Sequence, residues 1–144
     1  MDATTLKGIP PILPGLFGFK GDNEDSPVLL GGYCPQCQKH FYPRPQRCHY
    51  CLEPLDEVEL GDTGTIYSFT IVRKKAPFGL PVPYGVGFVD LDGCGLRIFS
   101  LFDPAKLDDL AIGQTVTLSV GPLGHDGNGN PCLRPFFAPR TGGQ

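Results

Sequence analysis

The feature that most constrains this chain is a set of four closely spaced cysteines, arranged as two Cys-x2-Cys pairs in "CPQCQKHFYPRPQRCHYC" (34–51). This spacing lets both sulfurs of a pair turn toward one point, and two such pairs complete a tetrahedron around Zn²⁺. A closed four-thiolate shell leaves no position for water or substrate, so we predict a structural zinc, one per chain. Two disulfides, a redox Cys-x-x-Cys motif and an iron-sulfur cluster are the alternatives. The predicted ligands are Cys34, Cys37, Cys48 and Cys51.

The composition of the 144 residues indicates a mainly β protein of the cytoplasm. Glycine (20) and proline (16) together are a quarter of the chain, which favours short strands and many turns. No apolar run is long enough to predict a membrane helix, and the first residues lack the pattern of a signal peptide. In the reducing cytoplasm, paired cysteines more often bind metal than form disulfides. The net charge of −3 argues against the broad basic face that a phosphate backbone requires.

Alternation of apolar and polar residues predicts five strands after the cysteines, with a short helix that begins at the N-cap Asp103. In the first of these strands, Tyr67, Phe69 and Ile71 share one face, which we assign to the core. Five strands with a helix between the third and fourth are the plan of an OB barrel. The predicted strands are 65–72, 84–91, 95–102, 115–120 and 132–137.

These patterns divide the chain into three segments: an extended leader (1–33), a zinc ribbon (34–51) and an OB-fold domain (52–140). Prolines and glycines interrupt the leader before a helix could close two turns. Its apolar side chains are too many for a solvated tail, so we expect the leader to dock on a partner, with packing on its own barrel as the alternative. These side chains are Ile12, Leu13, Leu16, Phe17 and Phe19.

We predict no catalytic residues, because the sequence contains no recognisable catalytic set. Cys94 and Cys132 have no neighbouring histidine or carboxylate arranged as base and orienter. His125 lies in "GHDGNGN", whose surroundings lack the glycine and glutamate of a calcium loop. No phosphate-binding glycine loop, His-Glu-x-x-His or Gly-x-Ser-x-Gly motif is present. An independent enzyme is therefore disfavoured.

The chain resembles the DUF35 proteins, which join a rubredoxin-like zinc ribbon to an OB fold. The resemblance covers roughly residues 30–138 and includes the cysteine module with Pro43 and Arg44 between its pairs. Its other marks are "GTIYSFT" in the first barrel strand, "PY" opening the second, and "IGQ" before the fourth. The resemblance implies a zinc role for the four ribbon cysteines and places Pro43 and Arg44 on the ribbon tip.

The resemblance implies a non-catalytic accessory subunit of a thiolase-type (acyltransferase) complex. DUF35 proteins help to bind or channel the CoA ester, while a thiolase-like partner supplies the catalytic cysteine and histidine. The small subunit of benzoylsuccinyl-CoA thiolase, in anaerobic toluene degradation, is one similar kind. The archaeal bridge between acetoacetyl-CoA thiolase and hydroxymethylglutaryl-CoA synthase is another, and we favour the first. A nucleic-acid-binding protein with an OB fold and a zinc ribbon is the alternative class.

We expect a cationic face of the ribbon to meet CoA or the partner. CoA carries a 3'-phosphate and a diphosphate, which need cationic or backbone donors. Lys39, Arg44 and Arg47 lie between the cysteines with no acid among them, and Phe41 and Tyr42 would add apolar contact. The alternative is that the three cations only offset the charge of the thiolates.

Overall fold

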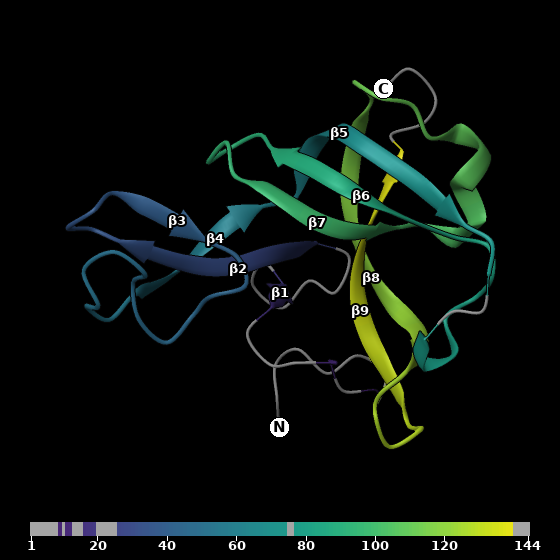
Figure 1. The fold of residues 1–144 in the computed structure, drawn as a ribbon, viewed down its shortest axis with the longest axis horizontal. Helices are drawn as coiled ribbons and strands as arrows, with labels where there is room; N and C mark the ends of the chain where they lie inside the picture. The colour runs from purple at the N-terminus through teal and green to yellow at the C-terminus, as the bar shows by residue number, and fades with distance from the viewer. Residues whose placement is uncertain (1–8, 10, 13–15, 20–25, 75–76, 140–144) are drawn as a thin grey trace.

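The computed structural model describes residues 9, 11–12, 16–19, 26–74 and 77–139, which form a four-stranded sheet and a closed five-stranded barrel (Figure 1). The barrel order is β5-β6-β7-β9-β8, and the predicted mainly β fold with a five-stranded barrel is confirmed. In the described part of the chain, no helix is long and apolar enough to cross a membrane. The sheet contains β1 (Phe17–Phe19), β2 (Pro27–Cys34), β3 (Lys39–Phe41) and β4 (Asp56–Gly61). The barrel contains β5 (Thr63–Val72), β6 (Tyr84–Leu91), β7 (Arg97–Phe102), β8 (Thr115–His125) and β9 (Pro131–Pro139).

The predicted helix is a short 3-10 helix, Pro104–Asp109, between β7 and β8. Its N-cap is Asp103, whose carboxylate accepts a hydrogen bond from the backbone N–H of Ala105 at 2.9 Å. Pro104 follows at the first helical position, where its missing N–H costs nothing. A second 3-10 helix, Pro77–Gly79, precedes β6.

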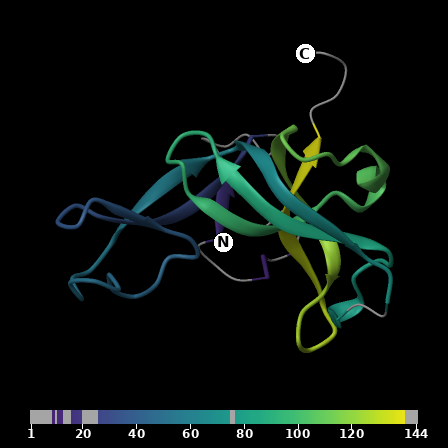
Figure 2. The same cartoon turned by 45° about the horizontal axis from the view of Figure 1, so that its top comes forward.

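Strand β2 is the centre of the sheet. All three of its partners are antiparallel: β1 and β3 pair with successive parts of one edge, and β4 pairs with the other edge. The sheet therefore combines residues of all three predicted segments, because β1 and most of β2 come from 1–33, β3 comes from 34–51 and β4 comes from 52–140. Its β2-β3 end projects away from the barrel in both views (Figure 1 and Figure 2).

One apolar core joins the sheet to the barrel. Leu29 of β2 and Leu60 of β4 are almost completely buried and pack with side chains from the inside of the barrel. The base of the sheet is thus anchored by apolar burial, whereas no described residue of β3 belongs to this core cluster. The barrel residues of this cluster are Ile66, Val89, Leu91, Ile98, Phe102, Val116, Leu118 and Phe137.

The described part of the leader packs on its own chain. Phe17 is buried, and its ring contacts Phe19 edge to face at 6.0 Å between centroids. The backbone N–H of Ile12 donates to the carbonyl of Leu133 on β9 at 2.9 Å. Leu13 lies outside the described residues, and docking of the leader on a partner stays a prediction.

The predicted burial of Tyr67 is wrong, because a β-bulge interrupts the alternation of β5. Ile66 pairs with Val89 and Ser68 pairs with Phe88, so that Tyr67 is the extra residue between them. An extra residue shifts the alternation by one position, so that the residues before it and the residues after it no longer follow one in-out pattern. Ile66 therefore enters the core at 1% exposure, while Tyr67 is 51% exposed on the outside of the barrel.

Candidate metal centre

The four ribbon cysteines converge at the projecting end of the sheet. Their sulfurs all lie within 4.8 Å of one another. Cys34 Sγ lies 3.5 Å from Cys51 Sγ, and Cys48 Sγ lies 3.9 Å from Cys37 Sγ. Zinc-sulfur bonds of about 2.3 Å would separate tetrahedrally placed sulfurs by about 3.8 Å. All six cysteines of the chain are free thiols, so the arrangement fits a metal shell rather than two disulfides.

The two cysteine pairs sit in loops that repeat one local structure. In both, the N–H four residues after the first cysteine donates to the carbonyl of that cysteine, from Gln38 to Cys34 at 2.7 Å and from Leu52 to Cys48 at 3.0 Å. A backbone N–H also donates to the first sulfur of each pair at 3.4 Å, from Cys37 to Cys34 Sγ and from Tyr50 to Cys48 Sγ. Each loop ends on a residue with a left-handed backbone, Gln38 at φ 58° and Leu52 at φ 65°. The backbone N–H groups orient the sulfurs and stabilise their thiolate forms. The tight turn of each loop therefore brings two cysteines that are separated by only two residues to one centre.

Crowding of four thiols gives them very different proton affinities. Hydrogen bonding to Cys51, together with burial, raises the pKa of Cys37 to about 12. Burial also raises the pKa of Cys48, but backbone hydrogen bonds outweigh it and lower that pKa to about 7. Metal binding must displace the remaining thiol protons, which makes the affinity of such a site depend on pH. The donor set, four sulfurs at tetrahedral spacing, fits a structural ion that prefers thiolates.

Three of the predicted contact residues surround the second cysteine loop. The ring of Phe41 lies 5.1 Å from the ring of His49, and Lys39 Nζ lies 5.8 Å from the centroid of Tyr50. Arg47 Nη1 donates to the carbonyl of Leu52 at 3.2 Å, an exposed hydrogen bond. The projecting end of the sheet therefore combines aromatic rings with two exposed cations.

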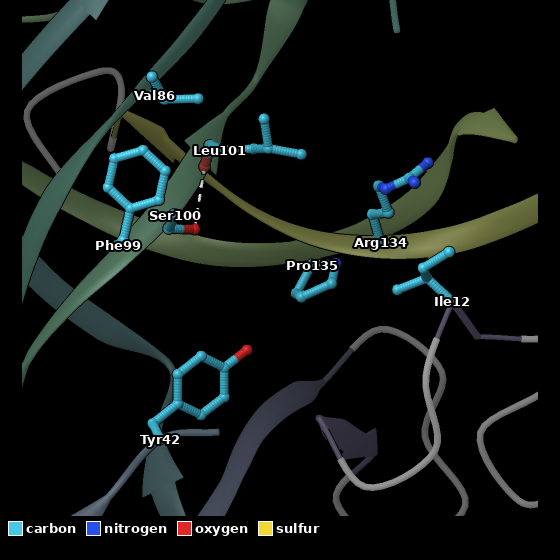
Figure 3. Close-up of a pocket in the computed structure, with 8 residues that line it drawn as sticks. All are labelled: Ile12, Tyr42, Val86, Phe99, Ser100, Leu101, Arg134 and Pro135. Carbon is cyan, nitrogen blue, oxygen red and sulfur yellow. Dashed lines mark hydrogen bonds between the residues drawn. The ribbon is translucent and has the colours of Figure 1, made fainter. Parts of the chain in front are cut away.

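The other two predicted contact residues lie nearer the barrel. Arg44 packs beside Gly32 of β2, and its Nη2 lies 3.8 Å from Glu57 Oε2 on β4. Tyr42 packs partly buried against the core and lines a groove on the barrel (Figure 3). The five residues thus form two groups, and only Lys39, Phe41 and Arg47 share the neighbourhood of the cysteines.

Four sulfurs placed to hold a metal ion, on a sheet that shares its core with an OB barrel, define the class of this chain, a zinc-ribbon-like and OB-fold protein. Residues 57–120 match the family described as "ChsH2, C-terminal OB-fold domain". A solved structure titled "Ltp2-ChsH2(DUF35) aldolase" is 26% identical, with a TM-score of 0.60, over 78% of this chain and 84% of that chain. No curated protein sequence matches. The predicted resemblance to the DUF35 proteins is confirmed.

Proposed function

We propose that this chain is a non-catalytic accessory subunit of a thiolase- or aldolase-type acyl-CoA enzyme, where it helps to bind or channel the CoA ester. The observation that carries the proposal is the likeness over 78% of the chain to a structure whose title pairs ChsH2(DUF35) with Ltp2 as an aldolase. In this proposal, a cytoplasmic thiolase-like partner supplies the catalytic cysteine and histidine. The benzoylsuccinyl-CoA thiolase type of complex is the kind that we favour.

The metal in this proposal is Zn²⁺, and its role is structural. Four thiolates close a tetrahedral shell, so a bound ion has no open position for a substrate. Zinc would hold both cysteine loops and thereby fix the residues between them. Preorganised side chains lose less entropy when they meet a ligand, which favours the ribbon as a binding surface.

Lys39, Arg44 and Arg47 are the proposed contacts for the phosphates of CoA or for the partner, with Phe41 and Tyr42 adding apolar surface. Arg44 pairs with Glu57 at 3.8 Å, but both side chains are about half exposed. An exposed pair at this distance contributes little, so the guanidinium can exchange its partner for a phosphate at low cost.

The proposal predicts that the purified chain alone does not cleave a 3-oxoacyl-CoA and that a complex with its thiolase-like partner does. The partner is to be identified by mass spectrometry after purification through a tag on this chain. The reason is that no activated nucleophile is recognisable in the sequence. Turnover by the chain alone that disappears in Cys94→Ser would contradict the accessory role and make Cys94 a nucleophile.

Replacing Arg44 and Arg47 together by alanine is expected to raise the KM of the complex for its acyl-CoA roughly tenfold, because two charge-assisted contacts to phosphate are lost. The kcat and the metal content should stay unchanged. The matched control is Arg73→Ala with Lys74→Ala, two exposed cations after β5 that the proposal does not use. If both double variants keep the original KM, the ribbon arginines do not contact CoA.

One observation favours the alternative class, a nucleic-acid-binding protein. The sequence assigned Tyr67 to the core, yet Tyr67, Phe88 and Phe99 are all more than two-fifths exposed, and exposed aromatic rings can stack on bases. The cation among them is already engaged, since Arg97 stacks on Tyr67 at 3.4 Å and its Nε donates to Asp90 at 2.7 Å. This hydrogen bond also lowers the pKa of Asp90. Aromatic rings whose neighbouring described cation is already paired suit an apolar ligand better than a phosphate backbone, so the accessory role remains favoured.

A further inference from the structure

The outer face of β6 and β7 carries apolar side chains that lead into a groove. Two cross-strand pairs point outward there, Val86 with Leu101 and Phe88 with Phe99. The rings of Phe88 and Phe99 meet edge to face at 5.3 Å, and Phe99 is 60% exposed. A sheet face of an OB barrel that is not covered by the rest of the chain is a usual place for ligands.

The groove lies between this face and the segment that follows β3 (Figure 3). Its volume is about 210 Å³. Phe99 forms one wall, and Pro135 of β9 and Ile12 of the leader continue it on the other side of Ser100, with Tyr42 facing them. An apolar cavity of about 150 Å³ can bind benzene, so this volume is room for one ring with a short substituent.

Two described residues that line the groove, Tyr42 and Ser100, carry hydroxyl groups. The hydroxyl of Tyr42 points into the groove in Figure 3 and has no hydrogen-bond partner among the residues that the structure describes. Burial raises the pKa of Tyr42 to about 12, so this group stays protonated at neutral pH and can donate. The hydroxyl of Ser100 already donates to the carbonyl of Leu101 at 3.1 Å, which leaves only its lone pairs for a ligand.

No free charge of a described residue faces the groove. Arg134 borders it through β9, but its guanidinium lies on the opposite side of the strand from Pro135 (Figure 3). There it donates to the carbonyls of Leu123 and His125. Among the described residues, the groove therefore offers apolar walls and one hydroxyl donor, and none of them presents to it the free cation that an anionic ligand would need.

We propose that this groove binds one kind of ligand, a small neutral group that carries a carbonyl oxygen. Its apolar part is an aromatic ring or a compact acyl group. The ring would pack between Phe99 and Pro135, and the oxygen would accept a hydrogen bond from Tyr42. The volume and the absence of a free described cation favour this occupant over an oligonucleotide. The inference goes beyond the accessory role, since it requires neither a partner nor CoA.

Acetophenone is a suitable probe because it is a neutral aromatic ketone of nine carbon and oxygen atoms. Titrated into the ¹⁵N-labelled, metal-loaded chain, it should shift the amide signals of Phe99, Ser100 and Leu101 with a millimolar Kd. Benzoate, which has the same ring but a full negative charge, should not produce these shifts. Tyr42→Phe, which removes only the hydroxyl, should weaken acetophenone binding roughly threefold to tenfold.

Phe99→Ala should abolish the shifts, because it removes one wall of the groove. Ile112→Ala is the matched control, since Ile112 is also an exposed apolar residue and does not line the groove. The proposal is overturned if acetophenone leaves the three amides unmoved, if Tyr42→Phe binds it as well as the original chain does, or if an oligothymidylate moves these amides and acetophenone does not. None of these results depends on co-purification of a thiolase-like partner, so either proposal can fail while the other stands.

Discussion

Cys37→Ala is expected to abolish metal binding and to unfold the projecting end of the sheet while the barrel stays folded. Three thiolates cannot close the shell, and metal binding contributes on the order of 10 kcal/mol to the folding of small zinc modules. The base of the sheet should survive, because Leu29 and Leu60 are buried in the barrel core. Elemental analysis should show the metal falling from about one ion per chain to nearly none. Backbone amides of β3 should lose protection from hydrogen exchange, while those of β6 keep it.

Cys94→Ser is the matched control for this variant, since Cys94 is a free cysteine outside the four-sulfur cluster. It should leave the metal content unchanged. X-ray absorption of the original chain should give zinc-sulfur distances of about 2.3 Å. A Cys37→Ala chain that keeps its metal would contradict the four-sulfur site. Loss of all β-sheet circular dichroism would instead contradict the separate anchoring of the barrel.

The features that the sequence predicts well are those encoded locally. Two cysteines three positions apart can point to one centre whatever the rest of the chain does, and the structure brings all four together. The strands of the barrel follow from alternation over six or more residues, as in β8, where Val116 and Leu118 are buried. Asp103 followed by Pro104 marks the start of the 3-10 helix by its own chemistry.

The features that the sequence does not predict depend on pairing between distant segments. The bulge at Tyr67 arises from the register of β5 against β6, and no residue type within β5 predicts it. The groove combines Tyr42, Phe99 and Pro135, which lie far apart in the chain and meet only after β7 and β9 pair in parallel. The ion pair of Arg44 with Glu57 likewise depends on how the segment after β3 packs against β4. The only local indication of the groove in β7 was that Phe99 and Leu101, two apolar residues on the same side of the strand, point outward.

Gly87→Ala is expected to destabilise the barrel by about 3 kcal/mol or more, at the upper end of what overpacking costs. Gly87 lies buried on β6, opposite Phe69 and next to the bulge of β5. A methyl group on Gly87 would collide with the carbonyl of Ser68 and with the backbone of Phe69, and a strand backbone cannot move aside as a flexible side chain can.

The matched control is Gly127→Ala, because a methyl group there meets no atom within 4 Å and should change the free energy of unfolding by less than about 0.5 kcal/mol. Urea unfolding of both variants measures the difference. If Gly87→Ala were as stable as Gly127→Ala, then β5 and β6 could separate at the bulge without cost. The bulge would then not fix Tyr67 on the outer face, and the exposed position of this ring would no longer follow from the pairing of the two strands.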